Sequence, residues 1–486
     1  LCIITVLFFV NFFLTQREVI GLEYSLYFGA LYCAAIFVVY IIKCISGKDY
    51  TGIKGLGALI AGVLIAVLCN AGSFYTNYEM GQESIRGKSE LTTPGNAGKQ
   101  SSGLDKDYAF GWSYGKAETF TLLVPNMFGG SGKPYDNDSE SVKTLISLAQ
   151  SGQIPAEFVN NVAGSIPKYW GAQPWTAGPV YFGAIICFLF VLGMIVIRSR
   201  MKWALFAATL FFILLSWGKN LEWFNDAFFY HFPLYSKFRA VSSALVVPAL
   251  TMVIVAVWGI KEFFSGEIDK KSLNRSLYIS GGATAFICFI IAAAPGIFTD
   301  FVAANDAMWS NQVPAAYYQA LLADRKDMMT SDAWRSFMFI ALAIGILWLF
   351  LRIKESPQKV GLMASISIII LVLIDLWGVD KRFLNEDNFV AKSTYKAKTF
   401  PLTKASEAIL QDKNPSYRVL NLNNPFQEAM NSYYHKSIGG YNAAKLRRYQ
   451  ELIDHRLVGE IGNITGSFAS QNLDTIVAAL EKNTSL

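Results

Sequence analysis

The chain has 486 residues, of which 53% are hydrophobic and only 16% are charged, with a formal net charge of +6. A soluble globular protein of this length would carry about 25% charged residues. The charge is missing from apolar runs of about 15 to 22 residues, the length of a membrane-spanning helix. The composition therefore excludes an ordinary soluble domain, and its mild basicity does not indicate nucleic-acid binding, because membrane proteins gather Lys and Arg in cytoplasmic loops.

Nine apolar runs predict nine spanning helices in a polytopic α-helical bundle. They cover residues 1–14, 24–42, 55–71, 178–197, 203–217, 240–260, 277–294, 336–351 and 359–379. The first run begins at Leu1 with neither Met nor a basic leader. We interpret it as the second half of a spanning helix and expect the chain to be a fragment.

The connecting segments differ in charge and length, which predicts their sides of the membrane. Four are short and basic, around residues 43–54, 198–202, 261–275 and 352–359, and the positive-inside rule places them in the cytoplasm. The long segments then share the opposite side. They are a large loop (72–177), two outer loops (218–239 and 295–335) between spans four to nine (178–379), and a tail (380–486).

The outer segments contain predicted elements of their own. A helix begins at the N-cap Asp138 or Ser139 and stops at Gly152. Residues 298–309 and 314–329 have the pattern of amphipathic helices on the membrane surface. In the tail, helices over 404–412 and 442–457 flank a strand over 417–422, which predicts a small extracytoplasmic α/β domain.

The predicted spans contain one clear acidic residue, Asp375, near the outer end of the last span. Ion-coupled transporters place ionisable groups near the membrane midplane. The scarcity of charged residues in the spans therefore argues against a proton- or sodium-driven transporter. It favours a functional site at the outer membrane interface.

Five cations stand near predicted helix ends on the outer side: Arg86, Lys88, Lys219, Lys237 and Arg239. Arg offers a bidentate fork and Lys a point charge, so together they could hold the phosphate of a lipid. Two alternatives stay open. Arg86 and Lys88 could belong to a self-neutralised turn with Glu79, Glu83 and Glu90, and the others could be anchors whose charged ends reach the interface.

Acidic residues that could act as a catalytic base or bind a metal ion are fewer than the candidate cations. Glu118 precedes an apolar run, where desolvation could make it a base, although a Glu that complements a helix dipole is the commoner case. Asp136, Asp138 and Glu140 could attract a divalent cation, but they lack the glycine and the distal Glu of a calcium loop, which favours a solvated loop. No other metal-ligand spacing is present.

Aromatic residues mark the approach to the fourth predicted span. Trp170, Trp175 and Tyr181 surround Gln173 in "YWGAQPWTAGPVY". They fit an aromatic belt at the interface. The alternative is a groove that packs against a sugar ring or an isoprenoid chain.

Six stretches together resemble the YfhO family of bacterial membrane proteins, in its Bacteroidetes-type form: "RGKSELT", "GWSYGKAETFTLLVPNMFGGS", "YWGAQPWTAGPVYFGAI", "LLSWGKN", "PLYSKFRAVSSALVV" and "YYHKSIGGYNAAKLRRYQELI". The resemblance implies a GT-C-type glycosyltransferase of the bacterial cytoplasmic membrane. Such an enzyme takes its sugar from a polyprenyl phosphate and passes it to a cell-envelope polymer or glycolipid. The family's acidic residue lies in an N-terminal region that this chain lacks, so the base is unassigned, with Glu118 and Asp105 as fallbacks.

We therefore expect sugar transfer from a polyprenyl-phosphate carrier to an extracytoplasmic acceptor. The five cations would neutralise the donor phosphate, and Trp170, Gln173, Trp175 and Tyr181 would shape the groove. The expected partners are the lipid-linked sugar, the acceptor and membrane lipids, without nucleic acid. No cofactor is indicated, and a divalent cation stays open. Two alternatives are a lipid-carrier translocase or transporter and a non-enzymatic envelope scaffold.

Overall fold

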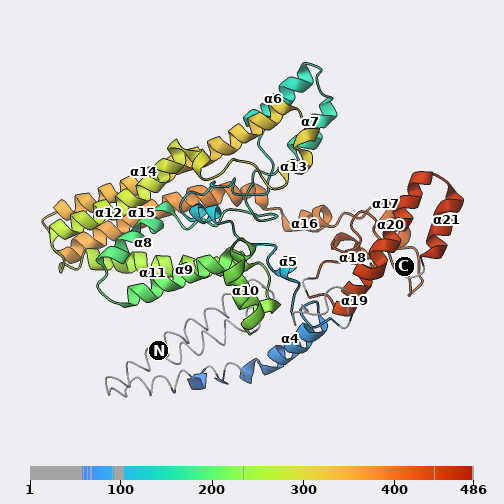
Figure 1. The fold of residues 1–486 in the computed structure, drawn as a ribbon, viewed down its shortest axis with the longest axis horizontal. Coiled ribbons are helices and arrows are strands. Elements are labelled where there is room, and N and C mark those ends of the chain that lie inside the picture. Colours follow the sequence, from blue (N-terminus) through green and yellow to red (C-terminus); the bar gives the residue numbers. More distant parts are fainter. Residues whose placement is uncertain are drawn as a thin grey trace.

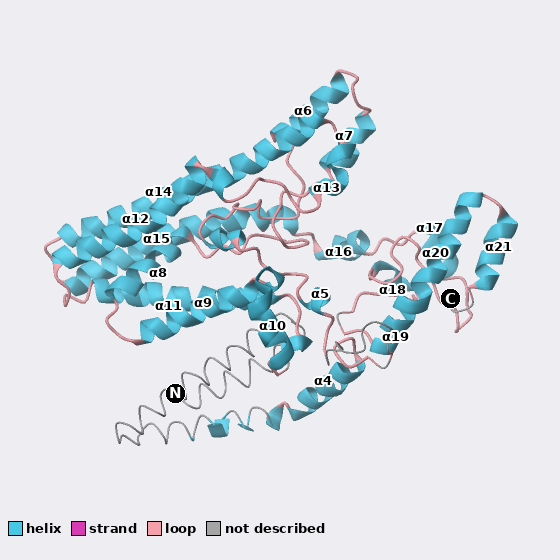
Figure 2. Ribbon diagram, in the orientation of Figure 1, coloured by secondary structure: helices cyan, strands magenta, loops and turns pink. Residues whose placement is uncertain are grey.

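The computed structural model describes residues 57, 60–62, 64, 65, 68–89, 91, 103–233, 235–442 and 444–483. Figure 1 shows a helical bundle with long connecting segments at one end, and Figure 2 shows its elements by type. β-pairing among the described residues is limited to three isolated bridges, Ser84–Leu446, Pro134–Pro167 and Val419–Ser437. The predicted spans 1–14 and 24–42, and residues 55, 56, 58, 59, 63, 66 and 67 of the predicted span 55–71, lie outside the described residues.

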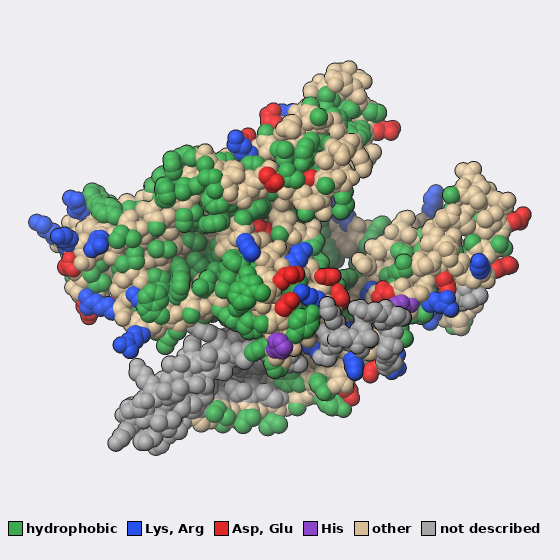
Figure 3. Space-filling model, in the orientation of Figure 1, with side chains coloured by type: hydrophobic (Ala, Val, Ile, Leu, Met, Phe, Trp, Pro, Cys, Tyr) green, Lys and Arg blue, Asp and Glu red, His purple; other side chains and the backbone are tan. Residues whose placement is uncertain are grey.

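Six helices form the bundle, and three short connectors define one of its ends. The helices are α8 (Ala184–Val196), α9 (Met201–Ser216), α11 (Val246–Phe263), α12 (Lys270–Ala293), α14 (Ala315–Arg352) and α15 (Pro357–Phe383). The connectors over 197–200, 264–269 and 353–356 lie together at what we call the connector end, and the long segments lie at the loop end (Figure 1). Lys and Arg gather at the connector end, while hydrophobic side chains cover the flank of the bundle (Figure 3).

Four described helical segments are long and apolar enough to cross a membrane: Val241–Phe263, Lys270–Ala293, Ala315–Arg352 and Pro357–Asn388. A fifth results if Met201–Ser216 and Gly218–His231 count as one span, although the chain bends by 112° between them. Helix α8 has only 13 residues, short of the about 20 that span the hydrocarbon core. The described helices thus indicate a membrane-embedded protein but do not support nine spans.

Helix α14 corrects one predicted boundary. Its 38 residues run without a break through the predicted surface helix 314–329 and the predicted span 336–351. The charged residues between them lower the local hydropathy, but Asp and Arg do not break a helix as Pro or Gly would. At about 1.5 Å per residue the helix is about 57 Å long, so it extends well beyond the hydrocarbon core.

The part of α14 nearest the loop end packs against α6 (Glu140–Gln150), whose predicted start is confirmed. The Ser139 hydroxyl accepts the Val142 amide as N-cap, and Gly152 follows the helix with a φ of +73°. Helix α7 (Ala156–Ala163) packs beside α6. Of the predicted surface helix 298–309 only the single turn α13 (Asp306–Trp309) is helical.

The predicted α/β domain in the tail is wrong. Residues 417–422 form no strand and contribute only the bridge at Val419, because no neighbouring segment continues the pairing. The region is instead a series of short helices: α16 (Lys392–Thr399), α17 (Lys404–Ile409), α18 (Met430–Tyr434), α19 (Arg447–Leu452), α20 (Val458–Ser467) and α21 (Leu473–Lys482), with a π-helical turn over Ile453–Leu457.

The main core lies between α8, α11, α12 and α14, and loop residues close it at the loop end. Leu122, Val124, Met127 and Trp170 belong to this core although they come from the large loop. Helices α8 and α11 cross closely, because a Cβ at Gly259 would lie 2.6 Å from the Gly193 Cα. The loops above the bundle are therefore packed onto it as part of one folded unit.

Candidate functional site

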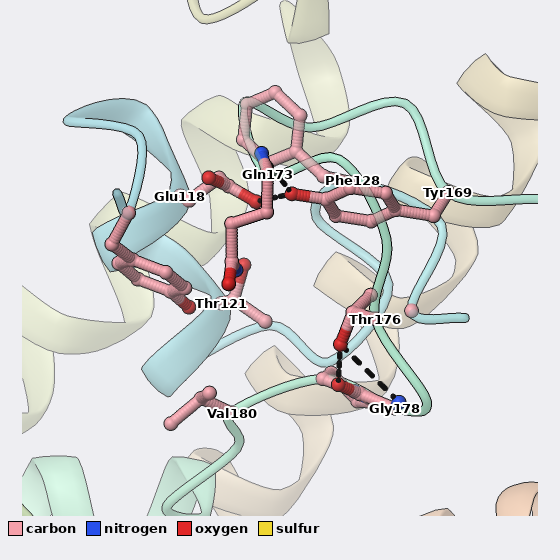
Figure 4. Close-up of a pocket in the computed structure, with 11 residues that line it drawn as sticks. Glu118, Thr121, Phe128, Tyr169, Gln173, Thr176, Gly178 and Val180 are labelled. Carbon is pink, nitrogen blue, oxygen red and sulfur yellow. Dashed lines mark hydrogen bonds between the residues drawn. The ribbon is translucent and has the colours of Figure 1, made fainter. Parts of the chain in front are cut away.

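The first candidate feature is a buried carboxyl group. Glu118 lies in the 3-10 helix η1 (Ala117–Leu122), and only 2% of its surface is exposed. It accepts the Tyr169 hydroxyl at 2.5 Å (Figure 4). It also accepts the amides of Gly115 and Ala172 at 2.5 and 3.3 Å. The carboxyl is thus held by three donors from two segments of the large loop.

Burial raises the pKa of the Glu118 carboxyl, and the hydrogen bonds from Tyr169, Gly115 and Ala172 offset only part of that rise. The folded chain therefore holds this proton to a higher pH than the unfolded chain does. A carboxyl group with a raised pKa can exchange a proton closer to neutral pH than an exposed Glu.

A small hollow adjoins Glu118. Tyr114, Thr121, Phe128, Tyr169, Gln173 and Thr176 are among the side chains that line it (Figure 4). It leaves about 20 Å³ open to the centre of a water molecule, which is room for about one water. The hollow can hold a hydroxyl group or a water near the carboxyl, but a sugar needs a wider opening.

The four residues expected to form a groove do not lie together. Gln173 lines the hollow, whereas Trp170 is 3% exposed and packs near the rings of Phe128 and Phe301. Trp175 is 59% exposed, and Tyr181 donates to Asp375 at 2.8 Å. Only Gln173 of the four faces the space beside Glu118.

Two of the five expected cations come into contact, and a third follows on the same segment. Lys237 donates to the Arg86 carbonyl at 2.5 Å, and Arg239 donates to the hydroxyls of Tyr108 and Tyr441 at 2.5 and 2.8 Å. Lys88 is exposed two residues after Arg86. Lys219 is exposed as well, and its backbone amide donates to Ser113 Oγ at 2.9 Å.

A fourth cation, Arg447, joins this group from the tail. It donates to the carbonyls of Ile85 and Gly103, next to the bridge between Ser84 and Leu446. We call Arg86, Lys237, Arg239 and Arg447 the basic cluster. Sequence reasoning missed Arg447, because the pattern of its segment predicted only a helix. The Arg-Arg pair that opens α19 was the one available signal.

The basic cluster brings positive charges close together. Burial and the nearby Arg447 lower the pKa of Lys237, as expected where like charges crowd together. Within the described part of the chain, Arg239 and Arg447 form no ion pair with a carboxylate, and their hydrogen-bond acceptors are tyrosine hydroxyls and carbonyls. An anion would supply the missing charge.

Asp105, the second fallback acid, has a local role. Its carboxylate accepts the amides of Asp107 and Tyr108 and so caps the short helix α5 (Lys106–Ala109). Tyr108 then accepts Arg239 and lies under its guanidinium at 5.3 Å. Asp105 therefore positions a partner of Arg239 and does not face the hollow.

An ion-pair network that the sequence did not predict joins α14 to α15 at the loop end. Arg382 binds Asp332 with two hydrogen bonds of 2.7 and 2.9 Å. Arg335 contacts Asp375 at 2.8 Å. Asp375, the one clear acidic residue expected within a span, is thus neutralised by a partner that was assigned to a loop.

Among the described residues, no three His, Cys, Asp or Glu side chains gather as metal ligands would. Asp136 pairs with Lys168 and Glu140 with Lys143.

Comparison of the chain with known protein families, with curated proteins and with solved structures finds no match.

Proposed function

We propose that this protein is a membrane glycosyltransferase that moves a sugar from a polyprenyl-phosphate carrier to an extracytoplasmic cell-envelope acceptor. The observation that carries the proposal is that neither Arg239 nor Arg447 forms an ion pair with a carboxylate of the described residues, at the loop end of an apolar bundle. A phosphate on a lipid would supply the missing negative charge from within the membrane surface.

The basic cluster and the buried carboxyl belong to one short stretch of chain. Trp112 lies 5.4 Å from the Arg239 guanidinium, and Glu118 follows six residues later. Six residues span at most about 22 Å even when fully extended. Lys219 borders the same stretch through its bond to Ser113. The proposal therefore places the donor and acceptor sites on one short stretch of the large loop.

The roles follow from the chemistry of transfer. The acceptor hydroxyl oxygen would form a bond to the anomeric carbon, while the bond from that carbon to the phosphate oxygen breaks. The electron pair would leave with the polyprenyl phosphate, whose growing charge Arg239 and Arg447 stabilise. The hydroxyl proton would go to a carboxylate. Among the described residues, the candidate for this carboxylate is Glu118, with Gln173 and Thr121 beside it.

The experiment replaces Arg239 by Gln and measures transfer from a polyprenyl-phosphate sugar in proteoliposomes. Removing one stabilising charge from a developing anion costs about 100-fold to 1000-fold in rate. The matched control is Arg352→Gln, because Arg352 also lies over an aromatic ring, 4.3 Å from Trp348, but at the connector end.

Unchanged transfer by Arg239→Gln protein that still inserts would refute the role of the cluster. Movement of the lipid carrier across the membrane without sugar transfer would favour the translocase alternative. Protein that leaves the lipid-linked sugar untouched under all conditions would favour a scaffold.

A further inference from the structure

A large apolar groove lies between α8, α11 and α15, away from the basic cluster. It encloses about 640 Å³, within the range of about 300–1000 Å³ that is typical of ligand sites. One face of α15 lines it from Pro357 to Leu373. At about 1.5 Å per residue that face is about 24 Å long. It is therefore longer than one leaflet, which is half of a hydrocarbon core about 30 Å thick. The groove can therefore take one extended acyl chain.

The polarity of the groove changes along its length. At the connector end it is lined by Lys261, Ser265 and Gln358. Towards the membrane interior the lining becomes aliphatic, with Ile369, Val372 and Leu373 on α15. This order matches a molecule with an ionic head and a hydrocarbon tail, with its head at the helix ends.

The charge at the connector end indicates whether the head group of the bound molecule is anionic or cationic. Lys261 is exposed and forms no ion pair with a carboxylate of the described residues. The acids nearby have other partners: Glu267 pairs with Arg198 and Glu355 with Lys359, and Glu262 accepts the Trp258 indole N–H at 3.0 Å. Basic pockets between spanning helices at such an end bind anionic lipid head groups.

We propose that this groove is a binding site for an anionic phospholipid. Its phosphate would lie at Lys261, with Ser265 and Gln358 as hydrogen-bond donors, and one acyl chain would lie along α15. The site is distinct from the loop-end cluster and would anchor α15, which has few contacts with α8 and α11, through a bound lipid.

The test uses the full chain in detergent and measures bound phosphatidylglycerol and phosphatidylcholine by native mass spectrometry. Wild-type protein should prefer phosphatidylglycerol by about fivefold, the effect of one cation at an anionic lipid surface. Lys261→Gln should abolish this preference, while the control Lys271→Gln, at the same end but outside the groove, should keep it.

A second pair of variants tests the chain site independently of charge. Ile369→Trp would fill the groove, whereas Ile370→Trp alters the next residue of α15, which is similarly exposed (53% against 57%) but lies outside the groove. Only the first should lower the binding of both phospholipids. Equal binding by the two variants, a preference that survives Lys261→Gln, or displacement of phosphatidylglycerol by an equimolar polyprenyl phosphate would overturn the proposal.

Discussion

The pair Asp306 and Arg325 offers the sharpest test of how the loop end is held together. Both side chains are almost fully buried, with 2% and 1% of their surfaces exposed. Arg325 donates to the two Asp306 oxygens at 2.5 and 3.1 Å, and to the Phe301 carbonyl at 2.7 Å. The pair thereby ties α14 to the segment that contains α13.

Asp306→Asn would leave the buried guanidinium without its counter-charge. Removing one partner of a buried ion pair lowers the free energy of unfolding by about 3–5 kcal/mol, because the remaining charge stays desolvated. The assay is reversible denaturation in detergent, followed by tryptophan fluorescence. Trp170 reports directly on this site, because the Arg325 guanidinium lies 5.9 Å from its ring.

Two further variants distinguish the loss of the buried ion pair from a nonspecific loss of stability. The double variant Asp306→Leu with Arg325→Met should be more stable than Asp306→Asn, since it leaves no charge behind. Lys143→Gln breaks the exposed pair with Glu140 and should leave the unfolding midpoint unchanged. If Asp306→Asn unfolds like wild type, or the double variant is the less stable, the argument from desolvation is wrong.

Two more predictions concern Glu118 and the α8–α11 crossing. The folded-state pKa of Glu118 is raised, so its stabilising contribution is complete below the pKa of an unfolded Glu and is lost as pH rises through the raised value. The thermal midpoint of Glu118→Gln should therefore fall less than that of wild type between about pH 4 and about pH 8, and parallel curves would contradict this. Gly259→Leu should cost about 1–3 kcal/mol through overpacking against Gly193, measured by the same denaturation assay, whereas Gly282→Leu, which faces open space, should not.

How far the sequence predicts the site is clearest from single residues. Lys237 and Arg239 stand four residues or fewer before the helical segment that begins at Val241, and the structure brings the Lys237 ammonium to the Arg86 carbonyl. Trp170 and Trp175 belong to the same aromatic stretch of the sequence, yet Trp170 is buried in the core and Trp175 is exposed. Residue type cannot separate them, because both belong to an irregular loop whose path depends on what it packs against.

The sequence by itself determined the apolar helices, the N-cap of α6 and the basic connectors, because these depend on local hydropathy, capping and charge. Tertiary structure alone decided that α14 is continuous, that Asp332 and Asp375 find Arg382 and Arg335, and that Arg447 joins the basic cluster. The two ion pairs and the position of Arg447 rest on contacts between residues that are distant in the sequence, and a buried charge is stable only beside its partner. Local patterns do not encode such a partner.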